Sequence, residues 1–118
     1  MKALLIFNRV PYDNTDVTWN GLRLASTLLD NSVEVRIFLV NDAVDMARDA
    51  YTPPEGYDQN LSQILKELIK RGVTVKACGT CIARCGIFKN HPYFDGVEES
   101  TIQALTEWVM DSDKIVSF

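Results

Sequence analysis

Three cysteines, the only ones in the chain, lie within one short stretch, KACGTCIARCGI, that runs from Lys76 to Ile87. Their spacing is Cys78-x-x-Cys81-x-x-x-Cys85. Cysteine thiolates bind zinc and iron–sulfur clusters, form redox-active disulfides and carry sulfur as persulfides. The rest of the sequence must indicate which of these chemistries applies.

Metal binding by this stretch is the first alternative. With His91, the only histidine of the chain, the three cysteines make a ligand set of the kind that holds tetrahedral zinc. The histidine lies beyond the segment GIFKN, however, and no second CxxC pair follows. An iron–sulfur cluster usually takes four cysteines, and this chain has three. We therefore predict that the site holds no metal and no other cofactor, and that His91 lies on a surface turn.

A thioredoxin-like dithiol formed by Cys78 and Cys81 is the second alternative, because residues three apart in a turn lie within disulfide reach. A helix that begins at the pair would lower the pKa of its thiols. The pair comes late in the chain, though, and no tryptophan directly precedes it. Free cysteines also often simply pack in a core. We favour that interpretation for Cys85, which follows Arg84 in an expected short helix.

The composition limits the classes of partner. A chain of 118 residues is expected to form one domain, residues 1–118. Its formal net charge of -4 and its lack of a basic run argue against nucleic acid. No apolar stretch approaches the roughly 20 residues that span a bilayer, and the start of the chain lacks the features of a signal peptide. We therefore expect a cytoplasmic protein with no membrane partner, in a compartment where structural disulfides are uncommon.

Apolar runs of strand length alternate with helical periodicity from end to end. The strands are expected at residues 3–8, 33–40, 73–78 and 113–118, with a further short strand at 94–97. Strands that alternate with helices in this way form parallel sheets. The sequence thus predicts an α/β fold with three layers: a doubly wound, mostly parallel sheet of about five strands, flanked by helices on both faces.

Capping residues mark the expected helices. The clearest helix spans 60–72, with apolar residues along one face and Gly72 at its C-terminal end. The candidate N-caps of the other helices are Asn14 or Thr15, Asn41 or Asp42, and Ser100 with Gln103 in capping-box spacing. The aspartates Asp13, Asp16, Asp42 and Asp45 are interpreted as helix caps and first-turn residues rather than as metal ligands.

Ligand sites of parallel sheets lie at the carboxyl ends of the strands. That edge is expected to carry Asn8 and Tyr12 after the first strand, Asn41 after the second and Cys78 after the third. We take Asn8, Tyr12 and Asn41 as candidate binding residues.

Tyr12, Tyr51 and Tyr57 lie in loops expected near the same edge. They can line a pocket or pack against a neighbouring subunit, and we favour the subunit contact.

The segment GVTVKACGTCIARCGI resembles the third strand and cysteine loop of the DsrE/DsrF/TusD-like sulfur-relay family. The segments FNRVPYDNTDVTWNGLRLA, RIFLVNDAV, PPEGYD and DKIVSF resemble other parts of the family in the same order. The resemblance covers the whole chain and is closest to the small, single-domain YchN-type members. It implies a doubly wound α/β domain that assembles into homo-oligomers, either trimers or hexamers.

The resemblance also implies roles for residues. In the relay members, a cysteine at the end of the third strand accepts sulfane sulfur as a persulfide and passes it to a partner protein. Cys78 matches that cysteine, while Arg84 and Gly86 match a basic residue and a glycine that follow it. Cys81 and Cys85 are extra relative to the relay members, although Cys81 resembles a second cysteine of the YchN-type variant.

Sulfur transfer requires a thiolate that forms near neutral pH. Adjacent cations and helix amides lower the pKa of a cysteine from its ordinary value near ~8.5. Lys76, Arg84 and the backbone N–H groups of GTCIA are candidates for that effect on Cys78, and Gly79 allows the backbone to turn tightly beside the sulfur. We take Cys78 and Cys81 as catalytic residues and Arg84 and Gly79 as binding residues.

The resemblance thus implies a sulfur carrier that works with a persulfide donor and a sulfur-acceptor protein, so that any activity is sulfurtransferase-like. If Cys81 reaches Cys78, it can attack the persulfide and release sulfide, or it can protect Cys78 from over-oxidation. Two other functions remain open at this point: a CxxC-type thiol redox protein that uses Cys78 and Cys81, and a non-enzymatic oligomeric subunit for regulation or binding.

Overall fold

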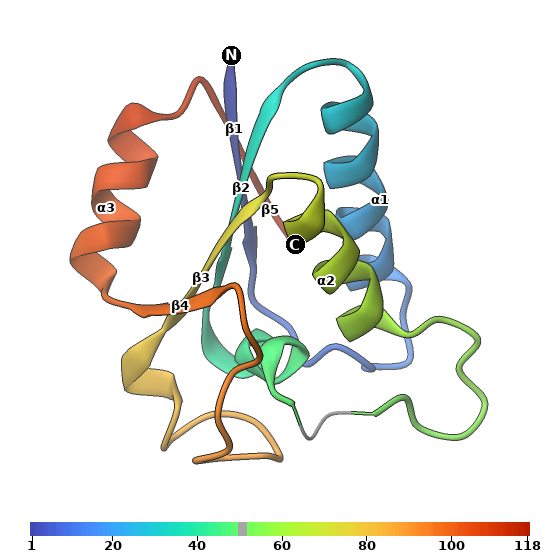
Figure 1. Cartoon of the computed structure of the whole chain (residues 1–118). Helices are drawn as coiled ribbons and strands as arrows, with labels where there is room; N and C mark the ends of the chain where they lie inside the picture. The colour runs from blue at the N-terminus through green and yellow to red at the C-terminus, as the bar shows by residue number, and fades with distance from the viewer. Residues whose placement is uncertain (50–51) are drawn as a thin grey trace.

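Five parallel strands form a single sheet at the centre of the molecule (Figure 1). The computed structural model describes residues 1–49 and 52–118. Its elements in chain order are β1 (Lys2–Phe7), α1 (Val17–Asp30), β2 (Glu34–Leu39), the 3-10 helix η1 (Asn41–Ala47), α2 (Leu61–Lys70), β3 (Thr74–Cys78), the short 3-10 helix η2 (Gly79–Cys81), β4 (Val97–Ser100), α3 (Ile102–Asp111) and β5 (Lys114–Ser117).

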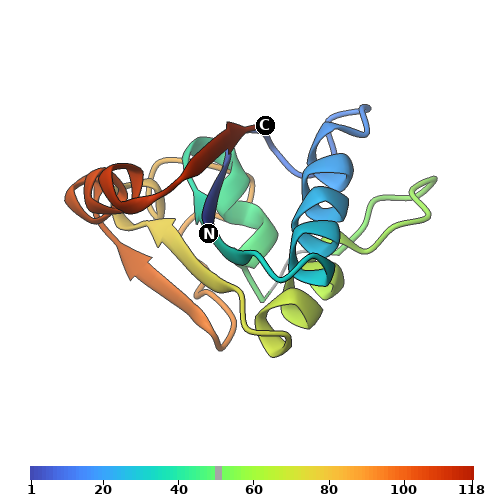
Figure 2. The same ribbon diagram turned by 90° about the horizontal axis from the view of Figure 1, so that it is seen from above.

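The strands are ordered β4-β3-β2-β1-β5, and every neighbouring pair is parallel. Helices α1 and α2 cover one face of the sheet and α3 covers the other, as Figure 2 shows from above. The three central strands are largely apolar because both of their faces are buried. The predicted α/β class, the parallel sheet and the helices on both faces are confirmed.

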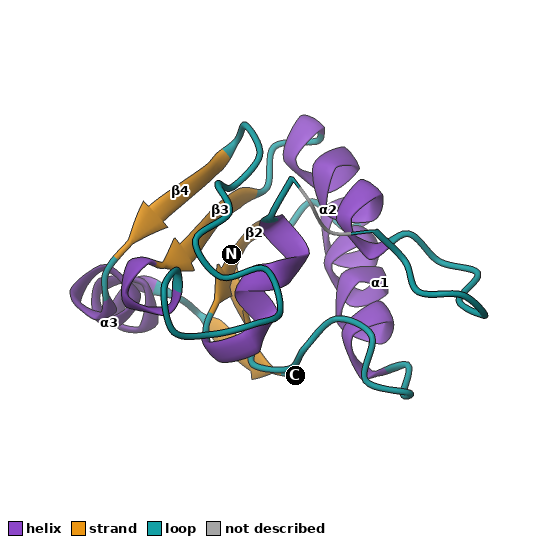
Figure 3. Ribbon diagram, turned by 90° about the horizontal axis from the view of Figure 1, so that it is seen from below, coloured by secondary structure: helices purple, strands orange, loops and turns teal. Residues whose placement is uncertain are grey.

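The parallel arrangement brings the carboxyl ends of β1, β2 and β3 to one edge of the sheet. Figure 3 looks onto this edge, where η1 and the connection from β3 to β4 lie across the strand ends. We call residues 79–96, which form that connection, the cysteine loop. All three cysteines therefore lie at this edge, at the end of β3 or directly after it.

Local sequence determines α2 and its boundaries. The side chain of Asn60 accepts a hydrogen bond of 3.0 Å from the N–H of Gln63 and so caps the first turn. Leu61, Leu65 and Leu68 are buried on one face of the helix. Gly72 follows its end with a φ of +104°, a conformation that favours glycine. This helix and its terminal glycine lie where the sequence predicted them.

The N-caps of two other helices were predicted wrongly. Helix α1 has Asp16 at its N-cap and no side-chain capping bond there; the hydroxyl of Thr15 accepts a hydrogen bond from Val17 N–H instead. Helix α3 is capped by Thr101, whose hydroxyl accepts from Ala104 N–H at 3.1 Å. Ser100 cannot cap it because it is the last residue of β4.

The edge strand predicted at 94–97 lies a few residues later in the chain. It runs from Val97 to Ser100, in register with Val75 to Cys78. Pairing with β3 thus positions this edge strand, which is too short and too polar to be located from its own residues. Residues 41–47 form a 3-10 helix without a side-chain cap, so the predicted capping by Asn41 or Asp42 is also wrong.

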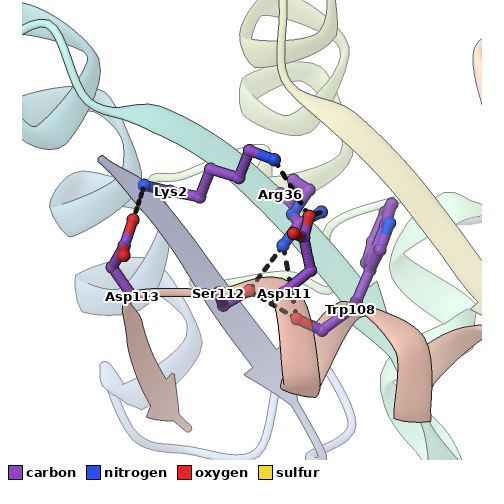
Figure 4. A network of polar contacts seen from close by, with 6 residues as sticks. All are labelled: Lys2, Arg36, Trp108, Asp111, Ser112 and Asp113. Carbon is purple, nitrogen blue, oxygen red and sulfur yellow. Dashed lines mark hydrogen bonds and ion pairs between the residues drawn. The ribbon is translucent and has the colours of Figure 1, made fainter.

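Helix α3 is fastened to the sheet through Arg36 of β2 (Figure 4). The guanidinium donates to the carboxylate of Asp111 at 3.1 Å and to the hydroxyl of Ser112 at 2.6 Å. It also lies 5.2 Å from the ring centre of Trp108. Lys2 adds an ion pair of 3.0 Å to Asp111. Hydrogen bonds from Lys2 and Arg36 lower the pKa of the Asp111 carboxyl.

Candidate functional site

Cys78 ends β3 and pairs with Ser100 of β4, so its sulfur lies at the carboxyl edge of the sheet. The chain then turns through η2, which places Cys81 one turn later. Cys78 is 7% exposed and Cys81 is 9% exposed, whereas Cys85 is only half-buried. All three are free thiols. Solvent access therefore increases along the series from Cys78 to Cys85.

Hydrogen bonds stabilise the thiolate of Cys78. The hydroxyl of Thr80 lies 3.1 Å from the sulfur, and the thiol of Cys81 and the N–H groups of Thr80 and Cys81 also contact it. Burial by itself raises the pKa of Cys78, but these hydrogen bonds outweigh it and the pKa is lowered from its ordinary value. The predicted ionisable thiol thus has a local cause.

The residues that lower this pKa differ from those predicted. Lys76 lies beside the ring of Trp108 and pairs with Glu98 at 3.9 Å, while Arg84 is exposed. The sequence missed Thr80, although a hydroxyl two residues after the cysteine was the available signal. The expected effect of the backbone N–H groups is present for two of them.

Cys81 lies between the other two sulfurs. Its thiol contacts those of both Cys78 and Cys85, and it accepts a hydrogen bond from the backbone N–H of Asn41. Burial, followed by the contacts with the two neighbouring thiols, raises the pKa of Cys81 to about 11. The three sulfurs therefore form a continuous series. Cys78, at the end of β3, favours the thiolate, and Cys81, in the middle, favours the thiol.

Gly79 lies close to another strand, β4. A Cβ at this position would lie 3.0 Å from the carbonyl oxygen of Ser100 and 3.0 Å from a carboxylate oxygen of Glu99. A side chain here would crowd β4, which would have to move by a few tenths of an ångström to admit it. We predicted Gly79 for a tight turn beside the sulfur and as a binding residue; the structure shows close packing against β4, and the binding role stays a prediction.

A buried ion pair that the sequence analysis missed supports the cysteine loop. Arg48 and Asp45 meet at 2.9 Å, and both side chains are 0% exposed. The same guanidinium donates to the carbonyl oxygens of Ile82 at 3.2 Å, Cys85 at 3.3 Å and His91 at 2.7 Å. One side chain thus fixes three points of the loop. The available signal was an aspartate and an arginine three residues apart within the otherwise apolar segment DAVDMAR.

Asp42 and Asp45, which we interpreted as helix caps and first-turn residues, bind the loop; Asp42 does lie in the first turn of η1, but neither caps that helix. Asp45 accepts a hydrogen bond of 2.7 Å from Ile87 N–H, and Asp42 accepts one of 2.9 Å from Gly86 N–H. Gly86 has a φ of +84°, and a Cβ there would collide with the carboxylate of Asp45. These contacts keep the backbone after Cys85 against η1.

The other predicted binding residues divide into two groups. Asn41 contacts the cysteines through its N–H bond to Cys81. Arg84 lies on the same loop and lines an open cavity of about 410 Å³ together with Lys89 and Ile87. Asn8 lies at the same edge of the sheet, directly after β1, where its N–H donates to the carbonyl of Phe118 at 2.8 Å.

The hydroxyl of Tyr12 joins two loops at the same side of the molecule. It donates to the carbonyl of Gln59 at 3.1 Å and accepts from Leu61 N–H at 2.9 Å, so it ties the loop after β1 to the start of α2. The ring of Tyr57 lies 4.8 Å from that of Tyr12. Tyr51 lies outside the described residues, and the predicted subunit contact of these tyrosines stays a prediction.

Within residues 1–49 and 52–118, the His, Cys, Asp and Glu side chains form no group of three or more that is placed to hold a metal ion. His91 is exposed, as predicted for a surface turn. In the same part of the chain, the helices are all too short or too polar to cross a membrane.

Known proteins of one family match this chain over its full length. The profile of the DsrE/DsrF-like family matches residues 1–118. Protein YchN of Escherichia coli K12 is 36% identical over 119 residues, covering 99% of this chain and 98% of its own. Uncharacterized protein MJ0989 of Methanocaldococcus jannaschii is 33% identical over 118 residues and covers 100% of both chains.

Solved structures give the same result for the fold. The crystal structure of the E. coli ychN protein superimposes with a TM-score of 0.85 at 35% identity, and the match covers 100% of this chain and 99% of that one. A conserved protein of unknown function from Bacteroides thetaiotaomicron superimposes with a TM-score of 0.70 at 20% identity, covering 99% of this chain and 94% of that one. The second likeness concerns the fold alone.

Proposed function

Because this chain belongs to the DsrE/DsrF-like family, we propose that it is a sulfur carrier whose Cys78 accepts sulfane sulfur as a persulfide and passes it to a partner protein. The observation that carries this proposal is the thiol of Cys78 itself. It lies at the carboxyl edge of a parallel sheet, and hydrogen bonds from Thr80 and Cys81 lower its pKa. The three cysteines of the chain are free thiols, which fits a reducing compartment, and we propose that the carrier works in the cytoplasm.

The proposed transfer has two steps. The Cys78 thiolate attacks the outer sulfur of a donor persulfide, a new S–S bond forms, and the donor leaves as its thiolate. A thiolate of the acceptor then attacks the outer sulfur on Cys78, which leaves as a thiolate in turn. A lowered pKa favours both steps, because it increases the thiolate fraction and makes Cys78 a better leaving group.

Loading with a cysteine desulfurase and cysteine, followed by intact-mass measurement at early times, tests the proposal. The wild type should gain one sulfur atom, and Cys78→Ser should gain none. Cys85 is the more exposed thiol, so Cys85→Ser makes the matched comparison. Loading that persists in Cys78→Ser but disappears in Cys85→Ser would contradict the assignment.

A thiol redox function that uses Cys78 and Cys81 is the second candidate, and the contact between their thiols favours it. Under this function, a mild thiol oxidant should convert the pair to a disulfide, and no sulfur should be taken up from the desulfurase. Peptide mass mapping of the oxidised protein distinguishes the two functions.

We also propose that the protein assembles as a homo-oligomer, a trimer or a hexamer. Large apolar side chains on α3 and β5 remain exposed in the single chain: Ile102, Val109, Met110, Ile115 and Val116. Such a surface is typical of an interface. Light scattering should give a multiple of the chain mass, and Met110→Glu should reduce it; a monomeric wild type would contradict the proposal.

A regulatory or binding subunit with inert cysteines is the third possibility, and thiol reactivity tests it. The proposed carrier requires Cys78 to react with iodoacetamide at a lower pH than an ordinary cysteine. A Cys78 that labels only at the pH of an unperturbed thiol supports the inert subunit.

A further inference from the structure

The three thiols are connected in one series, with Cys81 in contact with both of the others. The backbone explains this arrangement. Cys81 follows Cys78 across η2, and the N–H of Cys85 donates to the carbonyl of Cys81 at 2.9 Å, which completes a further turn. Successive sulfurs are therefore one helical turn apart along the same segment.

We infer that Cys81 reduces the sulfane sulfur on Cys78 to sulfide and that Cys85 then exchanges with the resulting disulfide. The disulfide ends between Cys81 and Cys85, so that Cys78 becomes free for another sulfur atom. This inference rests on the proposed persulfide of Cys78. It gives Cys85 a chemical role, where the sequence favoured simple packing.

In the first step, the sulfur of Cys81 attacks Sγ of the Cys78 persulfide. The bond between Sγ and the outer sulfur breaks, and a disulfide forms between Cys78 and Cys81. Cys81 attacks as its thiolate, after losing its proton to solvent, and the outer sulfur leaves as hydrosulfide. The sulfane sulfur gains two electrons, and the two cysteine sulfurs lose two.

In the second step, the thiolate of Cys85 attacks the sulfur of Cys81. The bond between Cys78 and Cys81 breaks, a disulfide forms between Cys81 and Cys85, and Cys78 leaves as a thiolate. The direction follows from the hydrogen bonds of Thr80 and the nearby N–H groups, which stabilise Cys78 as the leaving group. The proton lost by Cys85 goes to solvent.

Exposure fits the outward direction. Cys78 and Cys81 are 7% and 9% exposed, whereas Cys85 is half-buried, so an external reductant reaches the disulfide of Cys81 and Cys85 more easily. A low-molecular-weight thiol, present in excess, supplies the two electrons that restore both thiols. Without this reductant, Cys78 can accept a second sulfur atom, but no second sulfide is released.

The loop contacts keep Cys85 in position for this exchange. The guanidinium of Arg48 binds the carbonyl of Cys85, and Asp42 binds the N–H of the next residue, Gly86. These two bonds hold the backbone on the C-terminal side of Cys85 in one position.

The test loads the reduced protein with sulfur from a desulfurase and cysteine, removes the donor, and follows sulfide and peptide masses. The wild type should release sulfide equal to the sulfur loaded and end with Cys81 joined to Cys85. Cys85→Ser should release the same sulfide but end with Cys78 joined to Cys81, and it should refuse a second sulfur. Cys81→Ser should keep its persulfide.

Wild type that keeps its persulfide, or Cys81→Ser that releases sulfide at the wild-type rate, would overturn the inference. Cys81→Ala, run in parallel, shows whether an effect of the serine comes from its hydroxyl. If neither Cys81 variant nor the wild type takes up sulfur, the proposed carrier function itself fails. Loading without sulfide release overturns only the inference.

The rate of release adds a second readout. The raised pKa of Cys81 means that its thiolate is scarce at neutral pH. The rate should therefore increase with pH up to the region of about 11, by about tenfold per unit while the thiol predominates. A rate that is independent of pH would contradict attack by Cys81.

Discussion

Two buried arginines fasten two parts of this molecule, the cysteine loop and helix α3, and they do so differently. Arg48, beneath the cysteine loop, pairs with Asp45, and both side chains are 0% exposed. Arg36, beneath α3, pairs with Asp111, whose side chain is 57% exposed. Each guanidinium also lies over an aromatic ring, Tyr93 and Trp108 respectively.

The hydrogen bonds of the two arginines differ as well. Arg48 satisfies three loop carbonyls in addition to its carboxylate. Nε of Arg36 is buried without a hydrogen-bond partner among the described residues. The cysteine loop also contains one such atom, the hydroxyl of Tyr93, so the difference lies in the arginines themselves: within the part of the chain that the structure describes, each nitrogen of Arg48 has a partner, and Nε of Arg36 does not. Arg36 likewise binds three groups of α3 and its end, Asp111, Ser112 and the carbonyl of Trp108. The contrast that remains is burial: loss of Arg48 would leave a fully buried carboxylate, and loss of Arg36 an exposed one.

The largest effect is expected for Arg48→Met. This change leaves the carboxylate of Asp45 buried without its partner, which should lower the free energy of unfolding by about 3–5 kcal/mol. Urea unfolding measures the loss. Adding Asp45→Asn should restore part of it, because the uncompensated charge is then gone.

Substitution of Gly86 should be next in size. In Gly86→Ala, the left-handed backbone and the collision with Asp45 act together, and we expect a loss of more than about 2 kcal/mol. Gly56→Ala is the matched control, because Gly56 also has a positive φ, +91°, with no heavy atom within 4 Å of a Cβ there. Equal losses in the two variants would show that Asp45 does not constrain the loop.

Arg36→Met should cost less than Arg48→Met. The carboxylate that it leaves behind is exposed and keeps its ion pair with Lys2, so we expect a loss on the order of 1 kcal/mol. The same urea titration measures it. Losses of similar size for the two arginines would remove the contrast between the two regions.

The smallest effect on stability is expected for Thr80→Val, which should act on chemistry instead. Without the hydroxyl, the thiolate of Cys78 loses one of the hydrogen bonds that stabilise it, so its pKa should rise. The midpoint of iodoacetamide labelling at Cys78, followed by peptide mass, should move to higher pH. Thr106→Val, which removes a hydroxyl from α3, should leave that midpoint in place.

Features that depend on neighbouring residues in the chain were predictable from the sequence. The helix from Asn60 to Gly72 has its cap, apolar face and terminal glycine within one segment. The position of Cys78 at the end of β3 follows from a short apolar run and the rule for parallel sheets. Both predictions are confirmed.

Features that depend on distant pairing were not predictable in this way. β4 is located by its register with β3, and its end at Ser100 moves the cap of α3 to Thr101. The roles of Asp42 and Asp45 depend on a loop about forty residues later in the sequence, as their bonds to Gly86 and Ile87 show. Their aspartate side chains are equally suited to capping a helix, so the local pattern could not distinguish the two roles.

The single guanidinium at Arg48 has a consequence for how the cysteine loop fluctuates. The guanidinium binds the carbonyls of Ile82, Cys85 and His91 together. Separation of one of these carbonyls from Arg48 therefore strains the bonds to the other two. Fraying residue by residue is therefore disfavoured, and the segment opens cooperatively. The amide hydrogens of Gly86 and Ile87 should then exchange with solvent deuterium through the same opening event and with the same protection factor.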